Sequence, residues 1–360
     1  MSLLQEPEFP RDLIAENSEA QKYVQDMLSQ IDKLKLFPNE HFVEVIGNVL
    51  SGTGLDLQGE SAQVRDLEKL VAAVQRGDFW VRRAHDPLIH PIGRVIAAKV
   101  FRAVQPDIFF VVGIIGFYDA SELPTFASSG IDVSKLPVPL ETATDDPTHL
   151  YALMECNPLE IPNSLVADML ATAPDTVARG EGVHFRKEAV SLAILHLSVS
   201  FWLLSNTPFG KKFQERLGEK AADASADFLK WIAQTVCRKL RQITGRETRL
   251  VISFQHKGCE VEFVLKGNEG PLATTEAMQA MEAAANQSLL LVEALLPSVP
   301  TRVTYGYDLP TKRWFPIHAT TRKVGIITDQ PYLITTQNLQ GGFSVGGRRL
   351  PLYQDKTETK

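Results

Sequence analysis

The sequence has few cysteines and no recognisable export signal. It contains three cysteines in 360 residues, and so small and odd a number cannot form a disulfide framework. Its first residues include no cationic segment followed by an apolar one, which a secretory signal would require. Together these absences favour a reduced, cytoplasmic protein.

Sequence motifs of catalysis and cofactor binding are also missing. The chain contains no P-loop, no dinucleotide-binding glycine fingerprint, no zinc-binding cysteine framework, no nucleophile elbow and no kinase signature. Gly52, Gly54 and Gly59 lie close together, but their spacing differs from that of phosphate-binding loops and predicts an exposed turn. We therefore expect no cofactor and no bound metal.

Charge is unevenly distributed along a chain of otherwise ordinary composition. Hydrophobic residues make up 44% and charged residues 22% of the sequence, which excludes wholesale disorder and a polytopic membrane protein. Residues 1–183 carry 14 Lys and Arg against 27 Asp and Glu, whereas residues 184–360 carry 23 against 16. The resulting net charges of −13 and +7 favour docking of the two halves on each other, or an anionic partner for the basic half. No dense basic run interleaved with aromatic residues is present, so the sequence does not favour nucleic-acid binding.

The first half is expected to be mainly helical. Apolar residues recur at three- and four-residue spacing, which predicts amphipathic helices at 24–34, 64–74 and 95–104 and a short one at 163–171. Apolar, β-branched and aromatic residues predict two strands, at 108–117 and 150–156, that we expect to pair. Between them, residues 119–147 are rich in proline and lack any period, which predicts a long irregular loop.

Residues 189–210 form a run of 22 residues without a formal charge. The run is long enough to cross a bilayer as a helix, and cations flank it. His196 near its centre and a polar end instead favour a helix buried in the core of a soluble domain. We expect the core helix, with membrane contact as the alternative.

The remainder of the chain changes from helical to strand periodicity. Apolar residues keep helical spacing over 213–243, which predicts a second long helix. From residue 249 the period becomes two, and two hairpins are predicted on either side of a helix at 275–296. This ββαββ order predicts an antiparallel sheet with its helix on one face.

These elements predict an α+β fold in four parts. The parts are an acidic, mainly helical region with a small strand pair over 1–183, long central helices over 184–246, a C-terminal antiparallel ββαββ module over 247–338 and a flexible tail over 339–360.

His85, Asp86 and His90 lie within six residues and are the first candidates for a catalytic site. Imidazoles and carboxylates transfer protons and bind divalent metals. The neighbouring prolines exclude the continuous helix that aligns paired histidines in metalloproteases, so a turn capped by Asp86 is the simpler interpretation. Cys156, at the end of a predicted strand, is a candidate nucleophile, although a buried structural cysteine is the more common case.

The sequence favours a non-catalytic interaction or effector protein that acts through protein contacts. A protein partner or a homo-oligomer is expected, and a variant of this hypothesis places residues 189–210 in a membrane. The alternative is a soluble hydrolase or transferase with a site near His85, Asp86 and His90 and the 119–147 loop as a lid. The expected location is the cytoplasm, or the inner face of a membrane.

Overall fold

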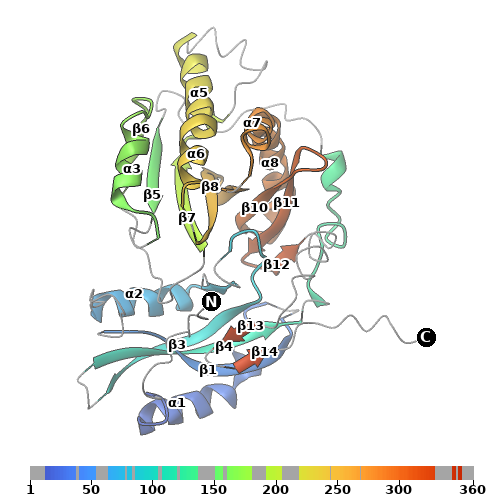
Figure 1. The fold of residues 1–360 in the computed structure, drawn as a ribbon. Coiled ribbons are helices and arrows are strands. Elements are labelled where there is room, and N and C mark those ends of the chain that lie inside the picture. The colour runs from blue at the N-terminus through green and yellow to red at the C-terminus, as the bar shows by residue number, and fades with distance from the viewer. Residues whose placement is uncertain are drawn as a thin grey trace.

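Two β-sheets and the helices packed on them form the described part of the chain. The computed structural model describes residues 13–37, 40–53, 64–77, 79–82, 86–103, 108–119, 122–136, 151–156, 160–180, 192–204, 219–243, 245–267, 269–328, 343–345 and 348–350. Within them lie a four-stranded and an eight-stranded sheet (Figure 1). A two-stranded sheet joins β13 (Phe343–Val345) to β14 (Arg348–Leu350), in the segment predicted to be a tail.

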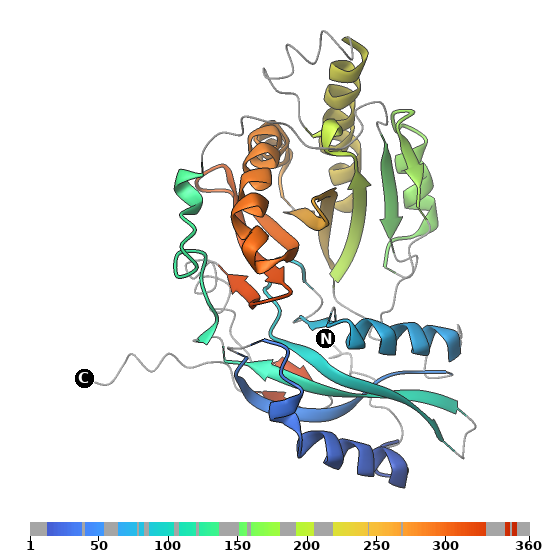
Figure 2. The ribbon, with the colours of Figure 1, turned by 180° about the vertical axis from the view of Figure 1, so that it is seen from behind.

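The small sheet is antiparallel throughout and lies between two helices (Figures 1 and 2). Its order is β1 (Phe42–Gly52), β4 (Ile108–Tyr118), β3 (Gly93–Ala103) and β2 (Trp80–Val81). Successive side chains of β4 point to opposite faces. Phe110 and Val112 accordingly pack on the side of α1 (Ser18–Leu28), and Val111 packs against α2 (Val64–Gln75).

This sandwich overturns the prediction of a mainly helical first half. The helix predicted at 95–104 is wrong, because these residues form strand β3. Helices cover both faces of the sheet, so apolar side chains occur on both sides of β3 and imitate helical spacing. The helix at 64–74 is confirmed as α2, whereas the one predicted at 24–34 starts and ends six residues earlier, as α1.

The large sheet is mixed and contains strands from both halves of the sequence. Its order is β12 (Gly325–Thr328), β11 (Arg313–Thr321), β10 (Pro300–Asp308), β9 (Cys259–Lys266), β8 (Glu247–His256), β7 (Leu192–Val199), β5 (Ala152–Cys156) and β6 (Val177–Arg179). Three neighbouring pairs are parallel, namely β5 with β6, β7 with β8, and β9 with β10. A helical connection links each of these pairs, as parallel strands require.

Helices cover one face of the large sheet. They are α3 (Asn163–Leu170), α5 (Glu219–Trp231), a π-helical turn (Ile232–Val236), α6 (Cys237–Leu240), α7 (Pro271–Gln279) and α8 (Met281–Leu295). Strand alternation divides β8 between the two faces. Leu250 and Ile252 lie in the main core with these helices, and Val251 packs on the opposite face against Leu88.

The helix predicted at 189–210 is wrong, because residues 192–199 form the interior strand β7 and a 3₁₀ turn follows at Phe201–Leu203. β7 lies between β5 and β8, and both of its faces are covered, so it needs no charged residue on either face. In the described residues no helix has the length and apolar character needed to cross a membrane. The membrane variant of the functional hypothesis had assumed a helix over 189–210, and the structure has strand β7 within that range.

Four further parts of the predicted architecture are corrected. The predicted pair of long central helices is wrong, because the first of them is strand β7. The second, predicted at 213–243, is helical over 219–240 in the described residues, and it lies on one face of the sheet. The strands predicted at 108–117 and 150–156 do form, as β4 and β5, but in different sheets. Both C-terminal hairpins form, yet the module is not antiparallel, because β9 and β10 run parallel and the sheet continues into β7. Residues 275–296 form two helices, α7 and α8, that meet at Ala280.

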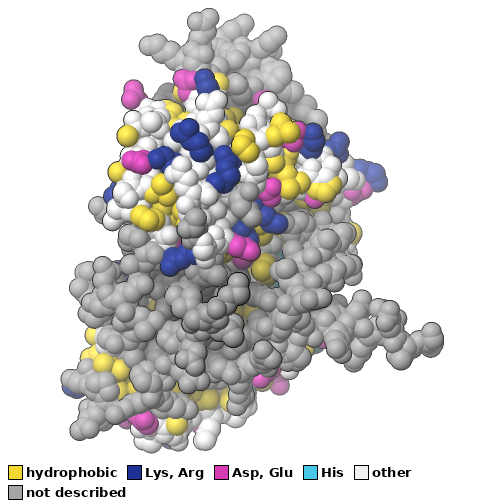
Figure 3. Space-filling view, viewed as in Figure 1, with side chains coloured by type: hydrophobic (Ala, Val, Ile, Leu, Met, Phe, Trp, Pro, Cys, Tyr) yellow, Lys and Arg dark blue, Asp and Glu magenta, His cyan; other side chains and the backbone are white. Residues whose placement is uncertain are grey.

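Among the described residues, two ion pairs cross the boundary between the acidic and basic halves. Asp86 pairs with Arg249 at 2.7 Å, and Asp168 pairs with Lys239 at 2.6 Å. Figure 3 shows Lys and Arg side chains gathered over the upper part of the molecule, where the helices of the large sheet lie. The first pair joins the segment around Leu88 to the large sheet, and the second joins α3 to α6.

Candidate functional site

The segment predicted to be catalytic lies against the helix-free face of the large sheet. Leu88 packs there with Ile194 and Val251. The Asp86 carboxylate accepts hydrogen bonds from Arg249 Nη2 at 2.7 Å and Nε at 3.1 Å, and from the backbone N–H of Leu88 at 3.0 Å. Asp86 therefore anchors this segment to β8. His85 lies outside the described residues.

The same face carries a row of polar side chains across neighbouring strands. Backbone register places Ser198, Ser253, Glu262, Thr304 and His318 side by side on β7, β8, β9, β10 and β11. We call these five residues the polar row. Glu262, Thr304 and His318 are buried, at 3%, 0% and 0% exposure. A polar row at this depth requires internal partners.

Glu262 has such partners. Thr304 Oγ1 donates a hydrogen bond to Glu262 Oε2 at 3.0 Å, and Arg302 Nε lies 3.2 Å from its Oε1. Arg302 also pairs with Glu260 at 2.7 Å. Burial raises the pKa of Glu262, whereas the positive charges of Arg302 and of the partly buried Arg82 lower it. The charges outweigh burial, so the pKa of Glu262 lies below its ordinary value. Glu262 is thus an ionised, paired carboxylate.

Two histidines face this group in their neutral form. Burial lowers the pKa of His90 to about 4, against the opposing effect of a contact between Nδ1 and the Pro91 carbonyl oxygen at 2.9 Å. Burial, together with Arg82 and His90, lowers the pKa of His318 well below its ordinary value. Neither ring nitrogen of His318 has a hydrogen-bond partner in the described part of the chain. Both imidazoles are therefore uncharged near neutral pH.

Glu262 belongs to a group of charged side chains that we call the buried charge cluster. It combines the guanidinium groups of Arg82, Arg249 and Arg302 with the carboxylates of Asp86, Glu260 and Glu262. Burial lowers the pKa of Arg82 to about 10, and the three carboxylates oppose that effect. General acid–base catalysis near neutral pH needs a group whose pKa lies close to the working pH. The groups with resolved pKa shifts in this cluster do not meet that requirement.

Sequence reasoning missed most of the buried charge cluster and one of the two histidines beside it. It singled out Asp86 and His90 but not Glu262, Arg302 or His318. The available signal was the alternation of Glu260 and Glu262 with apolar residues on β9, which is typical of a strand with one solvated face. The structure covers that face with the segment around Leu88, and a period of two cannot reveal a cover that comes from elsewhere in the chain.

Cys156 lies at the end of β5, where it is half-buried and carries a free thiol. Burial raises its pKa, and Glu160 adds to this effect against the opposing influence of Arg179. A nucleophilic cysteine needs the opposite shift, because the thiolate is the reactive form. In the described residues no three or more His, Cys, Asp or Glu side chains are grouped as a metal site requires.

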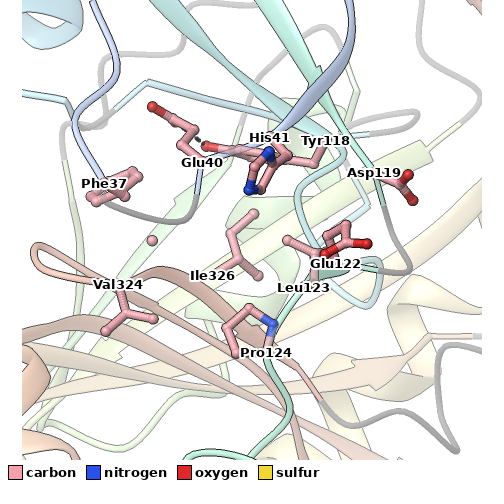
Figure 4. A pocket seen from close by; sticks show the side chains of 11 residues that line it. Phe37, Glu40, His41, Tyr118, Asp119, Glu122, Leu123, Pro124, Val324 and Ile326 are labelled. Carbon is pink, nitrogen blue, oxygen red and sulfur yellow. Dashed lines mark hydrogen bonds between the residues drawn. The ribbon is translucent and has the colours of Figure 1, made fainter. Parts of the chain in front are cut away.

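A shallow recess lies where the small sheet meets β12 (Figure 4). Phe37 and Glu40 border it on one side and Leu123 and Ile326 on the other. Its volume of about 20 Å³ is that of a water site and is too small for a metabolite. The recess therefore offers no ligand site of useful size.

Glu40, at the rim of this recess, belongs to a buried ion pair. Arg94 binds both of its carboxylate oxygens, one of them at 2.7 Å, and Tyr118 donates its hydroxyl at 2.8 Å. Both side chains of the pair are fully buried. This ion pair holds β1, β3 and β4 together and is structural.

The backbone of β1 presents a different kind of site, namely an open strand edge. β1 pairs with β4 on one side and, within the described residues, with no strand on the other. Two hydrogen bonds show which residues of β1 bond to β4 and which bond to the other side. They run from Asp119 N–H to His41 O at 3.3 Å and from Thr53 N–H to Phe109 O at 2.7 Å. Alternate residues of an antiparallel strand bond to opposite sides. Glu44, Ile46 and Asn48 therefore bond to β4.

Val45, Gly47 and Val49 accordingly direct their backbone N–H and C=O groups away from the sheet. The N–H of Val49 donates to its neighbour Asn48 Oδ1 at 2.8 Å, in agreement with this phase. The outward groups of Val45 and Gly47 make no hydrogen bond within the described part of the chain. Val43 beside them is 65% exposed.

Comparison with known proteins does not add to this description. The sequence matches no protein-family model, and no curated protein or solved structure is significantly similar to it. The function is therefore argued from the geometry of the chain.

Proposed function

We propose that the protein is a non-catalytic binding protein that acts through contacts with another polypeptide, at the open edge of β1. The observation that carries the proposal is the row of outward backbone groups on Val45 and Gly47, which lack hydrogen-bond partners in the described part of the chain. Such a row is a template for an added strand, because main-chain hydrogen bonds supply affinity without a specialised pocket.

The other edges of the two larger sheets support this choice by contrast. β2 and β6 are only two and three residues long, and short edge strands resist pairing. The edge of β12 is covered, since Phe126 N–H donates to Thr328 O at 3.3 Å and Thr328 N–H donates to Pro124 O at 3.0 Å. β1 has eleven residues and contains no lysine, arginine or proline. Its two register shifts against β4 lie near its ends, between Phe42 and Glu44 and between Val49 and Ser51, and they leave Glu44–Val49 as a regular run. Among the described strands it is the long edge strand that no other described strand pairs with.

The alternative of a hydrolase or transferase has less support. Asp86 is paired with Arg249, and the pKa of His90 is lowered to about 4 by burial. The loop predicted to be a lid packs down where it is described, since Gln287 Nε2 donates to Val133 O at 3.2 Å. Asp86 is held in an ion pair, and the lowered pKa of His90 lies far from the neutral range that general acid–base catalysis needs.

The proposal is tested by photo-crosslinking from position 43 in cells. A photoreactive residue replaces Val43 in three backgrounds: the natural sequence, Val45→Pro and Val45→Thr. Proline removes the outward N–H of Val45 without removing a bond to β4, and threonine keeps that N–H. We expect adducts in the natural and threonine backgrounds and their loss with proline. Mass spectrometry of the adduct identifies the crosslinked segment.

Circular dichroism and thermal unfolding of the purified variants provide the control, because Val45→Pro must leave the fold intact for the comparison to hold. Adducts of equal yield in the proline background would show that the edge is not the contact. An absence of adducts in all three backgrounds would equally overturn the proposed function.

A further inference from the structure

We infer that the strand added to β1 is β1 of a second copy of this chain, so that the protein is a dimer. This inference rests on the proposed function and specifies its partner. The two small sheets then form one continuous antiparallel sheet around a two-fold axis, which is the symmetry of most soluble dimers.

The outward backbone groups of β1 complement those of an antiparallel copy. With Gly47 opposite its own copy, Val45 lies opposite Val49 of the second copy, and all three residues direct their N–H and C=O groups across the interface. Each of these pairs exchanges two hydrogen bonds. The N–H of Val49 leaves its local bond to Asn48 Oδ1 to do so.

The charge of β1 also fits a copy of itself. Glu44 is the only charged residue in Phe42–Gly52. In the register centred on Gly47, Glu44 lies opposite Leu50 of the second copy and away from the other Glu44. Like charges directly opposite each other destabilise a strand pair, and this register avoids them.

Helix α1 provides an uncharged flank beside the same edge. It crosses the sheet diagonally, because Tyr23 contacts Phe101 of β3 with ring centroids 5.5 Å apart, whereas Val24 packs over Gly47 of β1. A Cβ on Gly47 would lie 2.7 Å from Val24 Cγ1, so glycine permits this close approach. Residues three before and four after Val24 share its side of the helix.

Those residues are Gln21 and Leu28, both exposed, with Leu28 at 38%. A two-fold axis perpendicular to the sheet brings the α1 helices of both copies to the same face. Their uncharged flanks then face each other and enlarge the interface beyond the two strands. The helix flanks add to the area of the strand contact, and stable interfaces bury about 1,000 Å² or more.

Sedimentation equilibrium of the full chain from 1 to 100 µM tests the dimer. We expect the natural protein and Val45→Thr to reach twice the chain mass of 39.9 kDa. Val45→Pro removes a donor in each copy and places its ring in the interface, so its dissociation constant should rise at least about tenfold. Leu28→Glu provides a second variant that leaves β1 unchanged, and it should weaken the dimer by placing like charges near the axis.

A natural protein that stays at 39.9 kDa up to 100 µM, or a Val45→Pro variant that dimerises as well as Val45→Thr, overturns the inference. If the protein is monomeric and the crosslinks from position 43 lead to a different polypeptide in a proline-sensitive way, the second copy is wrong and the proposed function stands. If neither dimer nor crosslink is found, both fail.

Discussion

Single residues show where this fold accepts an energetic cost. His318 is fully buried without a hydrogen-bond partner in the described residues, and burial of an unpaired polar group is unfavourable. Val299 adopts a left-handed backbone conformation, with φ of 56°, at the end of the turn that follows α8. A β-branched residue in this region is a genuine outlier, because its Cβ approaches the following carbonyl oxygen. Val299 ends this turn so that β10 can begin at Pro300.

Val299→Gly should stabilise the protein. The left-handed conformation costs a non-glycine residue about 1–2 kcal/mol, and the greater entropy of glycine in the unfolded chain offsets part of the gain. We expect the free energy of unfolding to rise by roughly 0.5–1 kcal/mol, measured by urea denaturation. Val299→Ala is the matched control, since it removes the partly exposed side chain without relieving the backbone. Equal effects of glycine and alanine would contradict this account.

At the scale of elements, the segment that the sequence predicted to be a buried central helix is instead the interior strand β7. Its residues alternate between two covered faces, with Leu195 in the main core and Ile194 packed beside Leu88. A segment that is buried on both sides needs no polar face, and its uncharged sequence is the same whether it folds as a strand or as a buried helix. Its neighbours β5 and β8 decide the outcome by offering backbone partners on both sides.

Leu195→Ala should therefore behave as a core substitution in an interior strand. Leu195 is fully buried, and removing its side chain leaves a cavity among the helices of the large sheet. We expect a loss of about 3 kcal/mol in the free energy of unfolding, measured by guanidinium denaturation. Leu272→Ala is the control, because Leu272 is 72% exposed and should change stability by less than about 0.5 kcal/mol. Similar values for the two variants would mean that β7 is not enclosed.

At the scale of the whole molecule, the buried charge cluster attaches the segment around Leu88 to the large sheet. Asp86 and Arg249 are almost fully enclosed, with side-chain exposures of 12% and 6%. Breaking such a pair costs more than its formation contributes, because the remaining charge stays buried. The cluster therefore opposes separation of the N-terminal elements from the large sheet.

This arrangement makes stability depend on pH through His90. Its pKa is about 4 in the folded protein, below its ordinary 6.5, so the unfolded chain takes up the proton first as the pH falls. Stability is full above pH 6.5 and is lost as the pH falls from 6.5 towards 4. The shift corresponds to about 3 kcal/mol in total. Urea denaturation at several pH values should show a smaller loss for His90→Asn than for the natural protein.

The exposed His41→Asn is the control for this pH experiment and should leave the pH dependence as in the natural protein. The predicted burial of neutral His90 would be contradicted if His90→Asn and the natural protein lost stability equally between pH 6.5 and 5.

The sequence by itself determined the helices with a single covered face and the hairpins with a tight turn. α2, α3 and the two C-terminal hairpins were predictable because a 3.6-residue or two-residue period and local turn residues specify them. β3 and β7 were not, because covers on both faces remove the period that distinguishes strand from helix.

Only the tertiary structure decided which strands are neighbours, and therefore what each candidate residue can do. Asp86 was recognisable as a polar residue in a proline-rich turn, but its partner Arg249 is 163 positions away. The open edge of β1 likewise has no sequence signature, because an edge is defined by the strand that does not lie beside it. The period of apolar residues indicates which side of an element is buried. Contacts between residues far apart in the sequence depend instead on which elements pack together in the folded molecule.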